Sequence, residues 1–278
     1  MDAVRCPRCL GFDRTETTGD FQGANVTSAP VRSTPRTDRV AASAVGLTKV
    51  YGSGEAEVRA LAGVDLEIHS GRFTAIMGPS GSGKSTMMHL LAGLDSASGG
   101  KVFLGDTELT SLSDKQLTKV RRDRIGFVFQ AFNLLPQLTA LQNILLPLDL
   151  AGRTADRKWL DTIVEVLGIK DRLSHRPAQL SGGQQQRVAV ARALVSRPDV
   201  IFADEPTGNL DSKSGQQLLA FLKQSVNQYG QTIVMVTHDP VAASYADRVV
   251  LLADGHLAGE IFQPTPDTVL DALRRLGA

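Results

Sequence analysis

A glycine-rich segment at residues 78–86 constrains the fold of this chain most strongly. It follows the apolar run 73–77 and precedes the helix-like run 87–92. Its residues are Gly78, Pro79, Ser80, Gly81, Ser82, Gly83, Lys84, Ser85 and Thr86. A strand that delivers such a loop, and a helix that begins where the loop ends, direct backbone N–H groups and the positive end of the helix dipole toward phosphate oxygens. The segment therefore predicts a nucleoside triphosphate site, in which Lys84 reaches the outer phosphates and Ser85 holds Mg2+.

Two adjacent acids follow a second apolar segment. Residues 200–203 are typical of a buried strand, and Asp204 and Glu205 come directly after them. A carboxylate at the end of a strand beside the phosphate loop can hold Mg2+ through water, and Asp204 fits that position. Glu205 can accept a proton from the water that attacks the terminal phosphate. One acid for the metal and one for the water predict a hydrolase.

Residues 180–187 predict a second phosphate-binding helix end. They read Leu-Ser-Gly-Gly-Gln-Gln-Gln-Arg, and a helical pattern continues to Leu194. Ser181 is a natural N-cap, and the two glycines leave bare N–H groups at the helix start. One nucleotide does not need two such helix ends within one subunit. The sequence therefore predicts that this end faces the terminal phosphate of a nucleotide held by another subunit.

Taken in order, these motifs resemble the nucleotide-binding subunit of ATP-binding-cassette (ABC) systems over about residues 44 to 262. The matching elements are Tyr51, the phosphate loop 78–86, Gln130 after the strand-like run 125–129, the signature 180–184, Asp204 with Glu205, the loop 209–211, and His238 after the run 232–237. Seven separated elements that agree in order and spacing make the match specific. Residues 132–140 and 143–148 most resemble the ATPases of the macrolide-export, lipoprotein-release and cell-division group. The permeases of that group have few membrane spans.

The resemblance implies a role for each matched residue. Catalysis is assigned to Glu205, His238, Lys84 and Gln130. ATP contacts are assigned to Tyr51, all nine residues of the phosphate loop, Ser181, Gly182, Gly183, Gln184 and Asp211. Mg2+ is assigned to Ser85, Gln130 and Asp204. Tyr51 by itself is equally consistent with simple packing, and its place in the ordered series favours stacking on adenine.

Charge and hydropathy limit the partners. A formal net charge of +1 provides no basic field, so no nucleic acid is expected. No apolar run reaches membrane-spanning length, and the start of the chain carries no secretory signal. The resemblance implies a cytoplasmic protein on the inner face of the cell membrane, bound to an integral membrane permease and to a second copy of itself around two ATP molecules.

Three other functions fit the sequence less well than this one. A soluble ABC-type ATPase acting on nucleic acid or chromosomes would generally interrupt the motifs with long coiled coils, and no heptads are evident here. A translation factor of this superfamily would carry two cassettes. A regulatory module without turnover would lack Glu205 or His238, and both are present.

Alternating strand and helix patterns predict an α/β fold: a P-loop NTPase core with a largely parallel sheet, an antiparallel β subdomain near residues 101–109, and a helical subdomain at about 131–179. Helices are predicted at 113–124, 139–146, 155–167, 212–229 and 266–276. The expected organisation is a disordered extension at 1–43, an ABC ATPase domain at 44–262 and a short helical tail at 263–278.

The first 43 residues lie outside the family pattern. They are rich in Thr, Ser, Arg, Pro and Asp, a composition typical of disorder. Cys6 and Cys9 have the spacing of half a zinc ribbon, but they are the only two cysteines, so a four-ligand site would need other ligands. An incidental pair is the favoured interpretation, and a start codon placed too far upstream is an alternative origin of the extension.

Overall fold

The computed structural model describes residues 39–276, so most of the predicted extension, with Cys6 and Cys9, lies outside the described residues. The predicted boundary at residue 43 is wrong, because β1 (Val40–Tyr51) begins at Val40. Ala41 and Ala42 are buried in the core and pair with neighbouring strands. Short alanine side chains carry little β signal in a sequence, and their burial is set by partner strands far along the chain.

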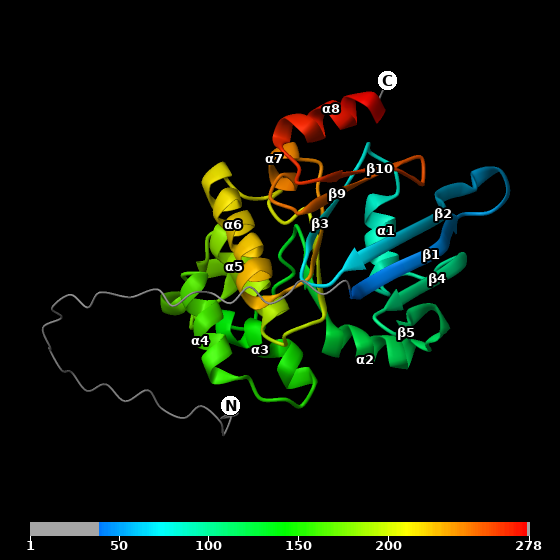
Figure 1. Ribbon diagram of the computed structural model, residues 1–278. Helices are drawn as coiled ribbons and strands as arrows, with labels where there is room; N and C mark the ends of the chain where they lie inside the picture. Colours follow the sequence, from blue (N-terminus) through cyan, green and yellow to red (C-terminus); the bar gives the residue numbers. More distant parts are fainter. Residues whose placement is uncertain (1–38, 277–278) are drawn as a thin grey trace, which may run out of the picture. The chain divides into compact units, whose positions relative to one another are not determined.

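The described strands form two sheets (Figure 1). The larger has the order β10-β9-β3-β8-β7-β6, and all its neighbours are parallel except β9 and β10. Its strands are β3 (Phe73–Met77), β6 (Ile125–Val128), β7 (Val200–Asp204), β8 (Ile233–Val236), β9 (Arg248–Ala253) and β10 (His256–Phe262). The smaller is antiparallel and contains β1, β2 (Val58–His69), β4 (Gly99–Leu104) and β5 (Thr107–Glu108). The predicted α/β fold with a largely parallel sheet and an antiparallel subdomain is confirmed.

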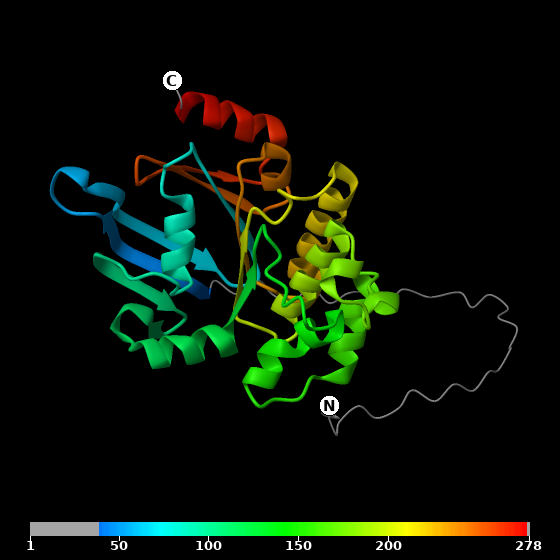
Figure 2. The ribbon, with the colours of Figure 1, turned by 180° about the vertical axis from the view of Figure 1, so that it is seen from behind.

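Eight α-helices surround these sheets in the described part of the chain. They are α1 (Lys84–Leu91), α2 (Asp114–Arg124), α3 (Ala140–Leu150), α4 (Arg157–Val166), α5 (Gly182–Leu194), α6 (Ser212–Tyr229), α7 (Pro240–Ala243) and α8 (Pro266–Leu276). Helix α1 lies between the two sheets, and the view from behind in Figure 2 shows it there as well. Helices α5 and α6 cover the opposite face of the large sheet. None of the helices in residues 39–276 combines the length and the apolar character that a bilayer crossing requires.

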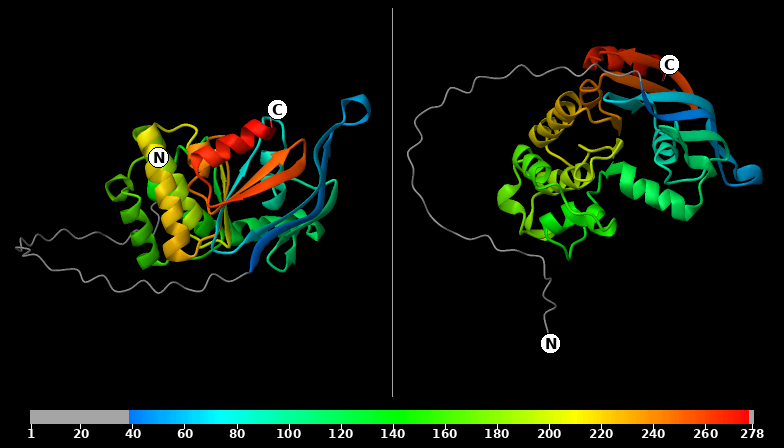
Figure 3. Two further views of the ribbon diagram at one scale, coloured as in Figure 1. Left: turned by 45° about the horizontal axis from the view of Figure 1, so that its top comes forward. Right: turned by 60° about the horizontal axis from the view of Figure 1, so that its bottom comes forward.

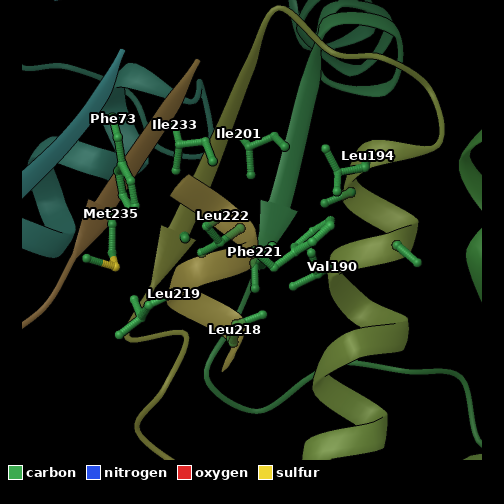
Figure 4. Packing of buried hydrophobic residues seen from close by; sticks show 14 of the residues in the cluster. Phe73, Val190, Leu194, Ile201, Leu218, Leu219, Phe221, Leu222, Ile233 and Met235 are labelled. Atoms are coloured by element: carbon green, nitrogen blue, oxygen red, sulfur yellow. The ribbon is translucent and has the colours of Figure 1, made fainter. Parts of the chain in front are cut away.

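The large sheet is buried on both faces because its strands are apolar at successive positions. On β3, Phe73, Ala75 and Met77 join the core under α5 and α6, while Ile76 joins the core around α1. The other parallel strands alternate in the same way. Figure 4 shows the first of these cores, with Ile201, Ile233 and Met235 from the sheet facing side chains of α5 and α6. Both faces of the large sheet are therefore packed against apolar side chains.

The helical region follows β6 and contains α3 and α4, which pack beside α5 (Figure 3). Helix α3 continues through Pro147 to Leu150, so the predicted end at residue 146 is wrong. Proline lacks an N–H group and usually ends a helix. Here Ala151 N–H bonds to the carbonyls of Pro147 and Leu148, which completes the last turn. Helix α6 ends at Gly230 with φ 67°, as the sequence predicted.

The predicted site residues gather at one edge of the large sheet. The phosphate loop follows β3, His238 lies two residues after the end of β8, Asp204 ends β7, and Gln130 lies two residues after the end of β6. These four strands are neighbours in the order β3-β8-β7-β6 and run parallel. The carboxyl ends of parallel strands are where α/β proteins bind ligands. Residues spread over 160 positions of sequence therefore meet along one edge.

Candidate active site

The phosphate loop needs its glycines because the chain passes close to other backbone. A Cβ on Gly78 would lie 2.0 Å from the carbonyl oxygen of Leu252, and a Cβ on Gly83 would lie 2.4 Å from that of Ala60. Gly78 has φ +151° and Gly83 has φ +99°, which side-chain-bearing residues rarely adopt. The Ser82 hydroxyl is buried within the loop and has no hydrogen-bond partner among the described residues. The loop is thus tightly packed against neighbouring backbone, and its buried Ser82 hydroxyl is free to bond to a ligand.

Lys84 lies at the start of α1, and its charge faces two carboxylates. Its Nζ donates a hydrogen bond to the carbonyl oxygen of Pro79 at 2.6 Å. Burial lowers the pKa of Lys84, against the opposing attraction of Glu205 and Asp204. Burial raises the pKa of Asp204, and Glu205 raises it further, while His89 and Lys84 lower it. The site therefore places one ammonium group beside two carboxylates.

Glu205 is held in a strained backbone conformation next to His238. Its φ is 44°, in the left-handed region, which residues other than glycine adopt only uncommonly. Its N–H donates to the carbonyl of Val236 on β8, and its own carbonyl accepts from Gly208. The carboxylate oxygen Oε1 lies 2.8 Å from Nδ1 of His238. An ionised carboxylate only accepts, so Nδ1 donates in this bond, and a neutral ring leaves Nε2 as an acceptor.

Gln130 follows the end of β6 and is tied to the loop after β7. The side-chain amide of Asn209 donates to the Gln130 carbonyl at 2.8 Å. A Cβ on Gly208 would lie 2.7 Å from Gln130 Nε2, so the Gln130 side chain packs against that glycine. Buried Gln186 of α5 donates through Nε2 to the carbonyl of Pro206 at 2.7 Å, next to Glu205. A buried hydrogen bond therefore joins helix α5 to the loop after β7.

The predicted second helix end is present at the start of α5. Ser181 is the N-cap and accepts from the N–H of Gln184, while Gln184 Oε1 accepts from the Ser181 N–H, which together form a capping box. The N–H groups of Gly182 and Gly183 lie in the first helical turn, where no helical acceptor is available. No hydrogen bond joins this segment to the phosphate loop within residues 39–276. The sequence analysis assigned Gln184 to ATP alone and did not predict its role in the capping box.

Tyr51 and Asp211 are engaged in local contacts. The Tyr51 hydroxyl donates to Asp95 at 2.7 Å, and the Lys49 ammonium lies 4.7 Å from the ring centre. Partial burial and Asp95 raise the pKa of Tyr51, while the nearby Thr86 hydroxyl acts in the opposite direction. The ring is therefore beside the phosphate loop, 42% exposed, with one face covered by an ammonium. Asp211 caps α6, and its hydrogen bonds to Ser214 lower the pKa of its carboxyl.

The residues fit a magnesium nucleotide. The narrow cradle of the loop, the unpartnered Ser82 hydroxyl and the Lys84 ammonium suit phosphate oxygens. Half-buried Asp204 and the exposed Ser85 hydroxyl are oxygen donors, which Mg2+ prefers. No group of three or more acidic, His or Cys side chains in the described chain could form a metal cage by itself. Mg2+ commonly takes one or two protein ligands and completes its shell with waters and phosphates.

Comparison with known proteins agrees with this geometry. The family model described as ABC transporter matches residues 61–208. The chain belongs to the ABC transporter family. The match runs from β2 to just after Asp204 and Glu205 and includes the phosphate loop, Gln130 and the signature.

Several relatives of this ABC protein are highly similar. The ABC transporter ATP-binding protein MJ0796 of Methanocaldococcus jannaschii is 47% identical over 220 residues, covering 77% of this chain and 94% of that protein. A structure of MJ0796, described as a dimeric post-hydrolysis state bound to ADP and Pi, has a TM-score of 0.73 over 80% of this chain and 98% of that one. The macrolide export ATP-binding/permease protein MacB of Marinobacter nauticus is 48% identical over 213 residues, but this chain spans only 33% of it.

The protein is thus an ABC-type ATPase and the ATP-binding subunit of an ABC transporter. Sequence reasoning missed Arg192 and Gln186 of α5, which contact the segment after Gln130 and the loop after β7. Gln186 is buried and Arg192 is partly buried. Both interrupt the apolar pattern of that helix, which is a signal that could have identified them. It also missed Asp95, which holds Tyr51 from 44 residues away.

Proposed function

We propose that this ABC ATPase closes as a dimer around two ATP molecules and thereby drives a membrane permease. Support for the dimer comes from two separate phosphate-binding helix ends, at α1 and α5, that share no hydrogen bond within the described chain. The structure of MJ0796, whose chain is 44% identical over the superposed residues, is described as dimeric in its complex with ADP and Pi. In the proposed dimer, Ser181, Gly182, Gly183 and Gln184 of one subunit face the terminal phosphate bound by the other, and Asp211 lies at the subunit contact.

Each side chain then has a specific task. The phosphate loop and Lys84 bind the triphosphate, and Tyr51 stacks on adenine with the face that Lys49 leaves open. Mg2+, held by Ser85, Asp204 and Gln130, would offset the negative charge of the phosphate oxygens. Glu205 accepts the proton of the attacking water, and its strained backbone fixes the direction of the carboxylate. His238 contacts the terminal phosphate. Because Nδ1 donates to Glu205 and Nε2 of a neutral ring only accepts, this contact requires either loss of the bond to Glu205 or a second proton on the ring.

An apolar groove supports the permease part of the proposal. It has a volume of about 400 Å³ and lies between β6, the end of α3 and the C-terminal end of α5. Phe127, Leu146 and Pro147 line it, with Leu94 and Leu150 at 40% and 66% exposure. Exposed aliphatic side chains gathered around a groove mark an interaction site. Phe129 and Asn133, which flank Gln130 in the sequence, also line the groove. An occupant of the groove would therefore lie close to the proposed nucleotide site.

Leu150→Glu is expected to abolish binding to the permease while the isolated protein keeps its ATPase rate. A charge in an apolar interface must be desolvated without a partner, so we expect co-purification from detergent-solubilised membranes to fall by at least about 10-fold. Val166→Glu is the matched control, because Val166 also lies at the end of a helix in this region, is 41% exposed, and does not line the groove. Equal loss in both variants, or none in Leu150→Glu, would remove the groove from the proposal.

Co-purification also identifies the partner. The proposed location is the cytoplasmic face of the cell membrane, and the similarity to MacB favours export or mechanical transmission through a permease with few spans. Recovery of a permease with many spans would support a role in transport but would contradict the assignment to the group whose permeases have few spans. Nucleic-acid partners alone would instead support a soluble chromosome-associated ATPase. The apolar groove is the observation that favours the permease over this alternative.

A further inference from the structure

The segment after Gln130 contains two consecutive residues in the left-handed region. Phe132 has φ 58° and Asn133 has φ 49°, and neither is glycine. Asparagine tolerates this region, but a bulky aromatic residue rarely adopts it. Such a conformation persists where surrounding groups hold it in place. The segment therefore needs an external clamp.

Arg192 of α5 provides that clamp. Its guanidinium donates through Nη1 to the carbonyl of Asn133 at 2.6 Å and through Nη2 to that of Phe132 at 2.9 Å. Burial lowers the pKa of Arg192, but a guanidinium remains charged in proteins. One planar group thus binds two adjacent carbonyls, which a lysine ammonium cannot do with the same geometry.

The clamped segment touches both halves of the proposed catalytic machinery. At its start, Gln130 packs against Gly208 and is bonded through its carbonyl to Asn209. In its middle, the Phe132 ring lies 3.7 Å from the position of a Cβ on Gly182, the first helical residue of the signature. A shift of this segment would therefore move the Gln130 side chain relative to the loop that follows Glu205.

We propose that Arg192 is a positioning residue for ATP hydrolysis and acts through Gln130. By holding the carbonyls of Phe132 and Asn133, it fixes the path of the chain after β6. That path determines the position of the Gln130 side-chain amide. This inference rests on the role proposed above for Gln130. It does not depend on the permease, because every contact that carries it lies within one subunit.

A double-mutant cycle on the isolated full-length protein tests the inference. Arg192→Lys is expected to lower kcat by about 10-fold, a typical effect of a small misplacement in an active site, and to change the dissociation constant of ATP by less than about two-fold. In a Gln130→Ala background the same change should lower kcat by less than about two-fold, because residues that act through one another are not additive.

Arg187→Lys is the matched control. Arg187 lies on the same helix and also donates to a backbone carbonyl, that of Leu167, but it bonds on its other side to Gln217, away from Gln130. Its effect on kcat should be the same with and without Gln130→Ala. An additive effect of Arg192→Lys would overturn the inference, and so would an unchanged kcat. If Gln130→Ala alone leaves kcat unchanged, the proposed role of Gln130 itself fails.

Variants at Asn133 test the clamp from its other side, without changing the partly buried Arg192. Asn133 is exposed, so substitutions there leave the core intact. Valine is strongly disfavoured at φ 49°, and Asn133→Val should therefore reproduce the kcat loss of Arg192→Lys. Glycine accepts this φ, and Asn133→Gly should keep kcat within about two-fold of the parent. Equal activity of the two variants would contradict the proposal even if Arg192→Lys failed to fold.

Discussion

Glu205→Gln is expected to lower the rate of ATP hydrolysis by about 100-fold or more, while ATP still binds and a closed dimer accumulates. Glutamine has nearly the same shape as glutamate, so it can still accept the hydrogen bond from His238 Nδ1. It cannot take up a proton from water at neutral pH. Phosphate release measures the rate, and light scattering after size exclusion with Mg-ATP measures the mass.

Glu165→Gln serves as the control for this variant, because Glu165 is an exposed glutamate of α4 outside the site. It should hydrolyse ATP like the parent and show no additional dimer. A Glu205→Gln protein that hydrolyses ATP normally would show that another group accepts the proton. A variant that binds ATP, does not hydrolyse it and remains monomeric would contradict the cross-subunit site.

Much of the site could be predicted from the sequence, because its residues belong to local motifs. The phosphate loop is bounded by a strand and a helix that each have a clear pattern. β7 and β8 are short apolar runs, and polar site residues lie at the end of β7 and two residues after β8. Ser181 was predicted as an N-cap from its own context and forms the cap. Helix ends set by Ser113 and Gly230 were predictable for the same reason.

What could not be predicted depends on contacts between distant parts of the chain. The left-handed conformations of Phe132 and Glu205 contradict local preference, and they exist because Arg192 and the carbonyl of Val236 hold them. The early start of β1 depends on pairing with β4, more than 50 residues later. Functional sites are where local and global preferences are expected to conflict.

Lys84→Ala is expected to weaken ATP binding by about 30-fold or more, because a charge-assisted hydrogen bond to phosphate contributes about 2 kcal/mol. In the parent, the Lys84 ammonium lies near Asp204 and Glu205 and offsets their repulsion of a triphosphate. Without it, two carboxylates face the phosphate oxygens with no neighbouring ammonium from the loop. Calorimetric titration with Mg-ATP at constant ionic strength measures the affinity.

Lys101→Ala is the matched control, since the Lys101 side chain is 58% exposed and pairs with Glu108 on the antiparallel sheet. Thermal unfolding of both variants separates loss of affinity from loss of fold. Because Lys84 also lowers the pKa of Asp204, its removal should raise that pKa further, so the remaining Mg-ATP affinity should begin to fall at a higher pH as pH decreases. An unchanged affinity in folded Lys84→Ala would mean that the loop N–H groups alone carry phosphate binding.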